Sequence, residues 1–270
     1  MGQAPRLARA ALHQWEEPCI SGTRGSGTVF FSGCSLRCVF CQNREISAGD
    51  YGREVSVERL RDIFEELIAQ GAHNINLVNP THFAAAIARA LEQPLPVPVI
   101  YNTGGYDRVE TLRMLEGKVQ VYLPDMKYAL PEPAARYSGA ADYPQVAKAA
   151  IREMVRQTGP YQIQEDGLLT QGVLIRHLIL PRNLQNTRRV IDWVADTFPK
   201  GMVLFSLMSQ YTPCGDLSRV PEIDRRLTRR EQQAAEEYLF AASIEDGFVQ
   251  ERTAAKQDYI PPFDLTGVER

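Results

Sequence analysis

The stretch that decides the fold is TVFFSGCSLRCVFC, residues Thr28–Cys41. Its opening residues are mostly β-branched or aromatic, a composition that favours a β-strand. Three cysteines follow directly, Cys34, Cys38 and Cys41, with the spacing CxxxCxxC and with Phe40 before the last of them. Three thiolates this close in sequence can converge on one face of a loop, and thiolates are the ligands that iron–sulfur clusters require. The stretch therefore predicts a strand followed by a metal-binding loop.

The loop supplies only three ligands, so the kind of metal site has to be considered. A four-iron cluster held by three cysteines leaves one iron with an open coordination position, the feature that separates a reactive metal site from a structural one. A structural zinc site completed by Cys19 or Cys214 is an alternative, because zinc favours four nitrogen or sulfur ligands. Three cysteines buried as small apolar side chains are a second alternative. Cys19 and Cys214 are otherwise interpreted as structural or incidental residues.

After this stretch, short β-branched or aromatic runs alternate with longer segments of helical period. This alternation is typical of parallel strands joined by helices. The predicted strands are residues 28–32, 74–79, 97–101, 119–123, 172–180 and 202–208. The predicted helices are residues 57–70, 82–91, 107–115, 143–158, 184–196 and 228–244. Such units predict an α/β fold with a partial (βα)6 TIM-type barrel, whose chemistry lies at the carboxyl ends of the strands.

Length and composition limit the class of protein. The 270 residues are 44% hydrophobic and carry a formal net charge of −3, with the basic residues scattered, so we expect no nucleic-acid partner. No apolar run approaches the roughly 20 residues that span a bilayer, and the first residues lack a secretory signal. We therefore expect no membrane partner and a cytoplasmic location, where cysteines stay reduced. We expect an N-terminal extension over residues 1–27, the barrel over 28–215, and a C-terminal helical extension and tail over 216–270.

The cysteine spacing, placed after the first strand of such a barrel, resembles the motif of the radical S-adenosylmethionine (SAM) superfamily. Within it, the chain is similar to the pyruvate formate-lyase activating enzyme-like group, in the segments WEEPCISG (15–22) and MSQYTP (208–213). The resemblance implies a [4Fe–4S] cluster on Cys34, Cys38 and Cys41, with the amino and carboxylate groups of SAM on the fourth iron. It also implies that one electron from the cluster cleaves SAM to methionine and a 5′-deoxyadenosyl radical, which abstracts a hydrogen atom.

The resemblance is less specific about substrate and partners. The implied activity is that of a radical SAM oxidoreductase, and one hypothesis is an activase that takes hydrogen from the glycyl loop of a partner glycyl radical enzyme. An alternative is an enzyme with the same radical that modifies a peptide or a small molecule. An alternative of another class is a non-enzymatic zinc-binding interaction protein. The radical chemistry implies an electron donor such as flavodoxin or ferredoxin.

The resemblance also places SAM-binding residues after the strands. Asn79 stands where the group has a Gly-Gly-Glu-Pro turn for the SAM amino group, with only the proline retained; a helix cap is the alternative interpretation. Arg176 matches an arginine that approaches SAM, and an arginine in an apolar strand needs an anionic partner such as the SAM carboxylate. For Asp125 and Lys127, a structural ion pair is the alternative. The predicted cofactor-binding residues are Phe40, Asn79, Asn102, Asp125, Lys127, Arg176, Gln210 and Tyr211.

Overall fold

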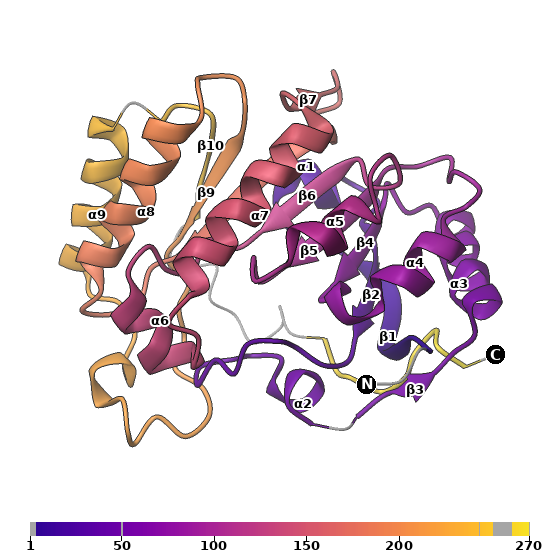
Figure 1. Cartoon of the computed structure of the whole chain (residues 1–270), viewed down its shortest axis with the longest axis horizontal. Coiled ribbons are helices and arrows are strands. Elements are labelled where there is room, and N and C mark those ends of the chain that lie inside the picture. Colours follow the sequence, from indigo (N-terminus) through magenta and orange to yellow (C-terminus); the bar gives the residue numbers. More distant parts are fainter. Residues whose placement is uncertain (1–3, 50, 243, 251–260, 270) are drawn as a thin grey trace.

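The computed structural model describes residues 4–49, 51–242, 244–250 and 261–269. Nine of its strands follow one another in the sheet in the order β10-β9-β8-β6-β5-β4-β2-β1-β3, and β7 pairs with β8 outside this path (Figure 1). The strands are β1 (Arg6–His13), β2 (Ser26–Phe31), β3 (Arg53–Glu54), β4 (Ile75–Val78), β5 (Val99–Thr103), β6 (Val121–Pro124), β7 (Gln162–Ile163), β8 (Leu169–Leu178), β9 (Leu204–Met208) and β10 (Gly247–Gln250). Neighbours from β2 to β10 are parallel, whereas β1 is antiparallel to β2 and β3, and β7 is antiparallel to β8.

Helices connect these strands and pack in neighbouring pairs, with α3 against α4, α7 against α5 and α6, and α8 against α9. The helices are α1 (Pro18–Ser21), α2 (Arg44–Ser47), α3 (Val57–Ala69), η1 (Thr81–Phe83), α4 (Ala84–Ala90), α5 (Val109–Arg113), α6 (Pro131–Ser138), α7 (Tyr143–Thr158), α8 (Leu184–Thr197), η2 (Pro221–Ile223) and α9 (Arg229–Ala241). The prediction of a mixed α/β fold with a mostly parallel sheet is confirmed.

Helix α3 shows how local sequence positions an element. The Ser56 side chain accepts a hydrogen bond from the Arg59 backbone N–H at 3.1 Å and caps the helix. Its buried face follows the helical period with Leu60, Ile63, Phe64 and Leu67. At the other end of the chain, α9 begins with the capping box that Thr228 and Glu231 form.

Residues Arg6–His13, near the start of the chain, belong to the sheet. Strand β1 lies within the segment 1–27 that the sequence marks as an extension, and it pairs with β2 along its length. Strand β10 continues the parallel sheet beyond β9. The boundaries of the proposed domains stay a prediction, but the sheet itself extends on both sides of residues 28–215.

Short helix α1 packs into the core of the partial barrel. Its residues Cys19 and Ile20 are buried and pack with Ile100, Leu174 and Leu204 from three strands. Because the rest of this core is apolar, α1 is held there by burial of its own apolar side chains. No helix in the described parts of the chain is both long enough and apolar enough to cross a membrane.

Candidate functional site

One cavity of about 310 Å³ lies where the parallel strands end. All three cysteines of the motif and all eight predicted cofactor-binding residues line it. They come from the loop after β2 and from the ends of β4, β5, β6, β8 and β9 or the loops after them. Parallel α/β sheets bind their ligands at this edge. The structure thus brings the predicted residues together, and what each of them binds stays a prediction.

The cysteine loop follows β2 and is packed against α6. Cys38 Sγ lies 3.0 Å from Ser138 Oγ, at the end of that helix. Burial raises the pKa of Cys34 to about 11 and also raises the pKa of Cys38, while the Lys127 ammonium acts in the opposite direction on both. Among the described residues, no three Cys, His, Asp or Glu side chains are already arranged around a metal position. The donor set nevertheless fits a three-cysteine cluster, because three free thiols of one loop face one cavity.

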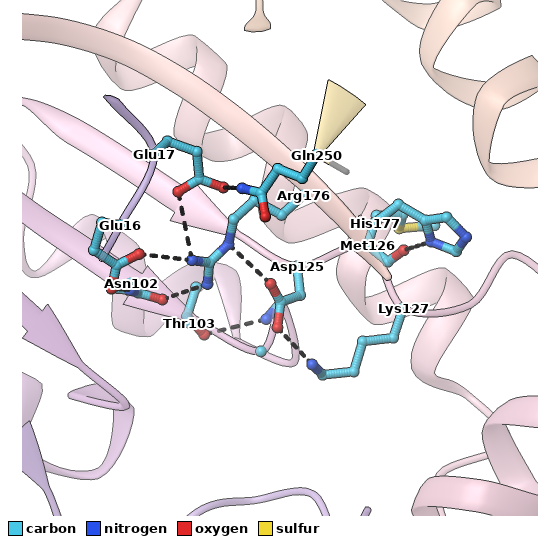
Figure 2. A network of polar contacts seen from close by, with 12 residues as sticks. Glu16, Glu17, Asn102, Thr103, Asp125, Met126, Lys127, Arg176, His177 and Gln250 are labelled. Atoms are coloured by element: carbon cyan, nitrogen blue, oxygen red, sulfur yellow. Dashed lines mark hydrogen bonds and ion pairs between the residues drawn. The ribbon is translucent and has the colours of Figure 1, made fainter. Parts of the chain in front are cut away.

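Arg176, on β8, is the centre of a polar network inside the partial barrel (Figure 2). Its Nε donates to Asp125 Oδ1 at 3.1 Å and its Nη2 to Asn102 Oδ1 at 2.7 Å. Its Nη1 donates to Glu16 Oε2 at 3.1 Å. Burial acts to lower the pKa of Arg176, but the surrounding carboxylates, Asp125 first, outweigh it and hold the pKa above its ordinary value.

These contacts give Arg176 two anionic partners within the chain. The sequence required an anionic partner for this arginine and assigned the SAM carboxylate to it. In the structure, Glu16 and Asp125 already meet that requirement. The need for an anion therefore no longer points to SAM, although Arg176 does line the cavity and its contact with SAM stays a prediction.

The sequence analysis missed Glu16, which lines the cavity, and its buried neighbour Glu17. Glu16 Oε1 accepts hydrogen bonds from Asn76 Nδ2 at 3.3 Å and Asn102 Nδ2 at 3.2 Å. Glu17 is 2% exposed and lies 3.9 Å from Arg176, and burial raises its pKa. Two adjacent glutamates near a chain end ordinarily form a solvated pair. The available signal was that both lie in the segment 15–22, which resembles the pyruvate formate-lyase activating enzyme-like group.

Asp125 and Lys127 form an ion pair at the end of β6, with Lys127 Nζ donating to Asp125 Oδ2 at 2.5 Å. Burial acts to raise the pKa of Asp125, but the charges of Lys127 and Arg176 outweigh it and lower the pKa. Burial acts to lower the pKa of Lys127, and Asp125 outweighs it and raises the pKa. Both groups are therefore charged. The structural ion pair that was the alternative interpretation is present, and both side chains also line the cavity.

Asn79 follows β4 and has a φ of 56°, in the left-handed region that asparagine and glycine adopt most readily. Its backbone N–H donates to the Asn102 carbonyl at 2.9 Å, which fixes the turn to β5. The helix-cap interpretation of Asn79 is wrong, because Pro80 holds the N-cap position of η1 and no side chain caps that helix. The Asn79 amide faces the cavity without a hydrogen-bond partner in the described parts of the chain.

Asp107 is a further residue that the sequence analysis missed, having assigned it to the start of the predicted helix 107–115. It is 1% exposed. Three hydroxyl groups donate to its carboxylate: Thr81 at 2.7 Å, Tyr101 at 2.9 Å and Thr103 at 2.6 Å. Burial raises the pKa of Asp107, with these hydroxyls acting in the opposite direction. The carboxylate ties together the segments that follow β4 and β5.

After β9, Gln210 and Tyr211 were both candidates for contact with the adenosine of SAM. The Tyr211 hydroxyl donates to the Ile223 carbonyl at 2.9 Å, and its ring packs edge-to-face on Phe40 with centroids 5.9 Å apart. Gln210 Nε2 donates to Gln250 Oε1 at 2.5 Å, while Gln210 Oε1 is buried without a partner in the described residues. Of the two side chains, Gln210 has the uncommitted polar atom.

The two remaining cysteines lie in different places. Cys19 is in the apolar core around α1 and is absent from the lining of the cavity. Cys214, distant in sequence from the motif, has its Sγ 3.0 Å from the Phe40 carbonyl within the cysteine loop. Of the two residues considered as a fourth zinc ligand, only Cys214 contacts that loop.

Residues 28–154 match the family model of the radical SAM superfamily. Together with the fold and the cysteine loop, this match defines the class of the matched part: residues 28–154 form a radical SAM domain, and the radical SAM family implies a [4Fe–4S] cluster and SAM.

The chain is also similar to one protein in sequence and to two solved structures in fold. The chain is 30% identical over 236 residues to the uncharacterized protein MJ0674 of Methanocaldococcus jannaschii, a match that covers 83% of this chain and 64% of that protein. Its fold is similar to that of SuiB from Streptococcus suis bound to SAM, with a TM-score of 0.54 at 10% identity over 86% of this chain and 52% of SuiB. It is also similar to HydG, a maturase of the [FeFe]-hydrogenase, with a TM-score of 0.56 at 14% identity over 83% of this chain and 50% of HydG. The chain thus spans about half of each solved structure and less than two thirds of MJ0674.

Proposed function

We propose that this chain is a radical SAM enzyme of the pyruvate formate-lyase activating enzyme-like group, working in the cytoplasm with flavodoxin or ferredoxin as electron donor. The bound cluster and SAM supply the radical chemistry: one electron breaks the bond between sulfur and C5′, giving methionine and a 5′-deoxyadenosyl radical that takes a hydrogen atom from the substrate. The observation that supports the proposal is the shared cavity, in which three thiols of one loop meet eight residues predicted to bind cofactor.

The residues of the chain have separate parts in this proposal. Cys34, Cys38 and Cys41 hold the cluster through their thiolates. Phe40, 8% exposed, lies on the loop between them and shields the site from water. Gln210 lines the cavity and contacts the adenosine. The charged groups of the network around Arg176 are held by one another, so they form a fixed polar wall rather than mobile side chains.

Anaerobic reconstitution tests this proposal. The purified chain is supplied with iron and sulfide, its absorbance is read at roughly 400 nm, where iron–sulfur proteins are brown, and dithionite-dependent formation of 5′-deoxyadenosine from SAM is measured. We expect a brown protein that cleaves SAM, loss of both properties in Cys38→Ala, and retention of both in Cys19→Ala. A colourless protein that holds one zinc ion tightly supports the zinc-binding interaction protein instead.

For the substrate, we propose hydrogen abstraction from the glycyl loop of a partner enzyme. The proposal rests on the resemblance of residues 15–22 and 208–213 to the activating enzyme-like group. A peptide-modifying enzyme is the second candidate, because SuiB, which shares the fold, has been described bound to a precursor peptide. Radical formation on a candidate glycyl radical enzyme, followed by electron paramagnetic resonance with and without this chain, separates the two.

A further inference from the structure

Two buried hydroxyl groups lie behind the cysteine loop and lead to Cys38. Ser138 Oγ, at the end of α6, lies 3.0 Å from Cys38 Sγ and 2.8 Å from the Tyr128 hydroxyl. Ser138 is 2% exposed and Tyr128 is fully buried, and the Tyr143 ring packs edge-on against the Tyr128 ring with centroids 5.4 Å apart. In the described parts of the chain, neither hydroxyl has another hydrogen-bond partner. The two hydroxyls therefore form a short chain of hydrogen bonds that ends on Cys38.

The backbone fixes Cys38 against the end of α6. The N–H group of Arg37, the residue before it, donates to the Ser138 carbonyl at 3.3 Å. The N–H group of Val39, the residue after it, donates to the Tyr137 carbonyl at 2.9 Å. Both carbonyls belong to the last turn of the helix, whose carbonyls have no partner within the helix. Because both neighbours of Cys38 are bonded to the helix end, the contact between Cys38 and Ser138 is set by backbone geometry.

The direction of each hydrogen bond follows from the state of Cys38. A cysteine that ligates a metal is a thiolate, which has no proton and can only accept. The Ser138 hydroxyl then donates its single proton to Cys38 Sγ, and its oxygen accepts from Tyr128. Burial raises the pKa of the Tyr128 phenol, so the phenol keeps the proton that it donates. Donation by Tyr128 makes Ser138 the stronger donor, because hydrogen bonds in a chain polarise one another.

The three cysteines of the motif differ in this respect. Cys41 Sγ lies 3.3 Å from the hydroxyl of Ser47, which is half-buried and has no second hydroxyl behind it in the described parts of the chain. Cys34 Sγ contacts no hydroxyl group of a described residue. Of the three thiolates, that of Cys38 thus has the shortest hydroxyl contact, and within the described residues its contact alone is backed by a second buried hydroxyl.

We propose that Ser138, supported by Tyr128, donates a hydrogen bond to the Cys38 thiolate of the cluster and thereby raises the reduction potential of the cluster. The inference rests on the proposed function. One electron enters the cluster from a one-electron donor and no proton moves, so the reduced cluster carries one more negative charge than the oxidised one. A hydrogen bond donated to a ligand sulfur is therefore stronger in the reduced state, and it favours that state. Ser138 and Tyr128 are positioning residues that ease the transfer of the electron.

A redox titration tests this inference without turnover. The full chain, reconstituted and free of SAM, is titrated with dithionite in the presence of mediators, and the electron paramagnetic resonance signal of the reduced cluster gives the midpoint potential. We expect the equilibrium constant for reduction to fall about tenfold in Ser138→Ala, which is about 59 mV for one electron. Ser138→Thr keeps the hydroxyl and should match the wild-type potential. Tyr128→Phe should lower the equilibrium constant about twofold, because Ser138 then donates without support.

Two further variants sharpen the test. Tyr137→Phe is the matched control for Tyr128→Phe and should leave the potential unchanged, since the buried Tyr137 hydroxyl donates to Glu222 at 3.0 Å instead of to Ser138. Because Tyr128 acts on the cluster through Ser138, Tyr128→Phe should not lower the potential further in the Ser138→Ala background. This double variant leaves no buried hydroxyl without its partner, so it should show the tenfold fall even if Ser138→Ala alone does not fold.

The outcomes separate the two proposals. A wild-type chain that assembles no cluster and cleaves no SAM overturns the proposed function, and this inference falls with it. A wild-type chain that assembles the cluster and cleaves SAM, with the same potential as Ser138→Ala or the double variant, overturns this inference alone. A lower iron content in Ser138→Ala at an unchanged potential also overturns it, because Ser138 then only shapes the loop. An effect of Tyr128→Phe that persists in the Ser138→Ala background contradicts the action of Tyr128 through Ser138.

Discussion

Arg176 Nη1 and Glu16 Oε2 lie 3.1 Å apart across 160 positions of sequence, with each side chain 13% exposed. Arg176 is on β8, and Glu16 belongs to the segment between β1 and α1. The contact anchors the N-terminal segment to β8, beside Asn102 of β5 and Asp125 after β6, which also contact Arg176 (Figure 2). The chain before β2 is therefore part of the site, in addition to being part of the sheet.

Loss of the Glu16 carboxylate should destabilise the fold strongly. Glu16→Ala leaves Arg176 with one fewer anion and leaves the Asn76 and Asn102 amides without an acceptor. Removal of one partner from a buried ion pair costs about 3–5 kcal/mol, and chemical denaturation measures the free energy of unfolding. Glu65→Ala is the matched control, since its 2.7 Å ion pair with Arg61 is exposed and worth about 0–1 kcal/mol. Equal costs for the two variants contradict the anchoring role of Glu16.

The parallel strands β2, β4, β5, β6, β8 and β9 could be predicted from sequence because buried strands are short, apolar and rich in β-branched residues. The parallel strand β10 was missed, because its residues were assigned to a helical extension. Strand β1 could not be predicted, since RLARAALH consists largely of good helix formers. It forms a strand because it pairs with β2 and β3 in the sheet, a tertiary contact that overrides local preference.

The residues of the site likewise divide into those that could be predicted from sequence and those that could not. Asn79, Asn102 and Asp125 could be predicted because each follows or ends a strand, where the fold gathers polar residues. Asp107 and the partner of Arg176 could not. The role of Asp107 arises from hydroxyls on separate segments of the chain, and Glu16 meets Arg176 only after the N-terminal segment has entered the partial barrel. Such contacts depend on the assembled fold and leave no periodic pattern in the sequence.

Gly105 should tolerate no side chain. A Cβ built at this position lies 2.2 Å from the Asp125 carbonyl oxygen and 2.9 Å from the Tyr143 hydroxyl. Gly139 has a similar left-handed φ, +67° against +80°, but nothing within 4 Å of its Cβ. Alanine costs about 1–2 kcal/mol at both positions through backbone conformation, and the clash adds about 1–3 kcal/mol at Gly105 alone. We expect that difference in the free energy of unfolding of Gly105→Ala and Gly139→Ala. If the two substitutions lower the free energy of unfolding equally, the backbone at Asp125, after β6, moves aside for the added Cβ without cost.

His177 should make stability depend on pH below neutrality. Its Nδ1 lies 2.7 Å from the Met126 carbonyl and its Nε2 lies 3.0 Å from the Thr187 hydroxyl, so the buried ring is neutral, with Nδ1–H donating and Nε2 accepting. Burial lowers its pKa from 6.5 to about 4. Between these two pH values the unfolded chain binds a proton that the folded chain does not, so stability falls as the pH falls.

The size of this effect follows from the pKa shift, since one unit corresponds to about 1.4 kcal/mol. The loss of unfolding free energy attributable to His177 should approach about 3 kcal/mol at pH 4. Urea denaturation at several pH values measures it as the difference between the wild-type protein and His177→Gln, which cancels the contributions of the acidic residues. Parallel pH profiles for the two proteins show that His177 is protonated in the fold without cost.

Cys214 should be dispensable for the cluster despite its position. Its Sγ contacts the Phe40 carbonyl at 3.0 Å, and the loss of one such bond costs about 1 kcal/mol. Cys214→Ala should therefore keep the iron and sulfide content of the reconstituted wild-type protein, whereas Cys41→Ala should lose most of both. Metal analysis for iron and zinc, made on the same samples, gives the readout. If Cys214→Ala holds as little iron as Cys41→Ala, Cys214 is a ligand of the cluster. If instead the wild-type protein holds a zinc ion that Cys214→Ala loses, the result favours a structural zinc site with four thiolates over the open cluster.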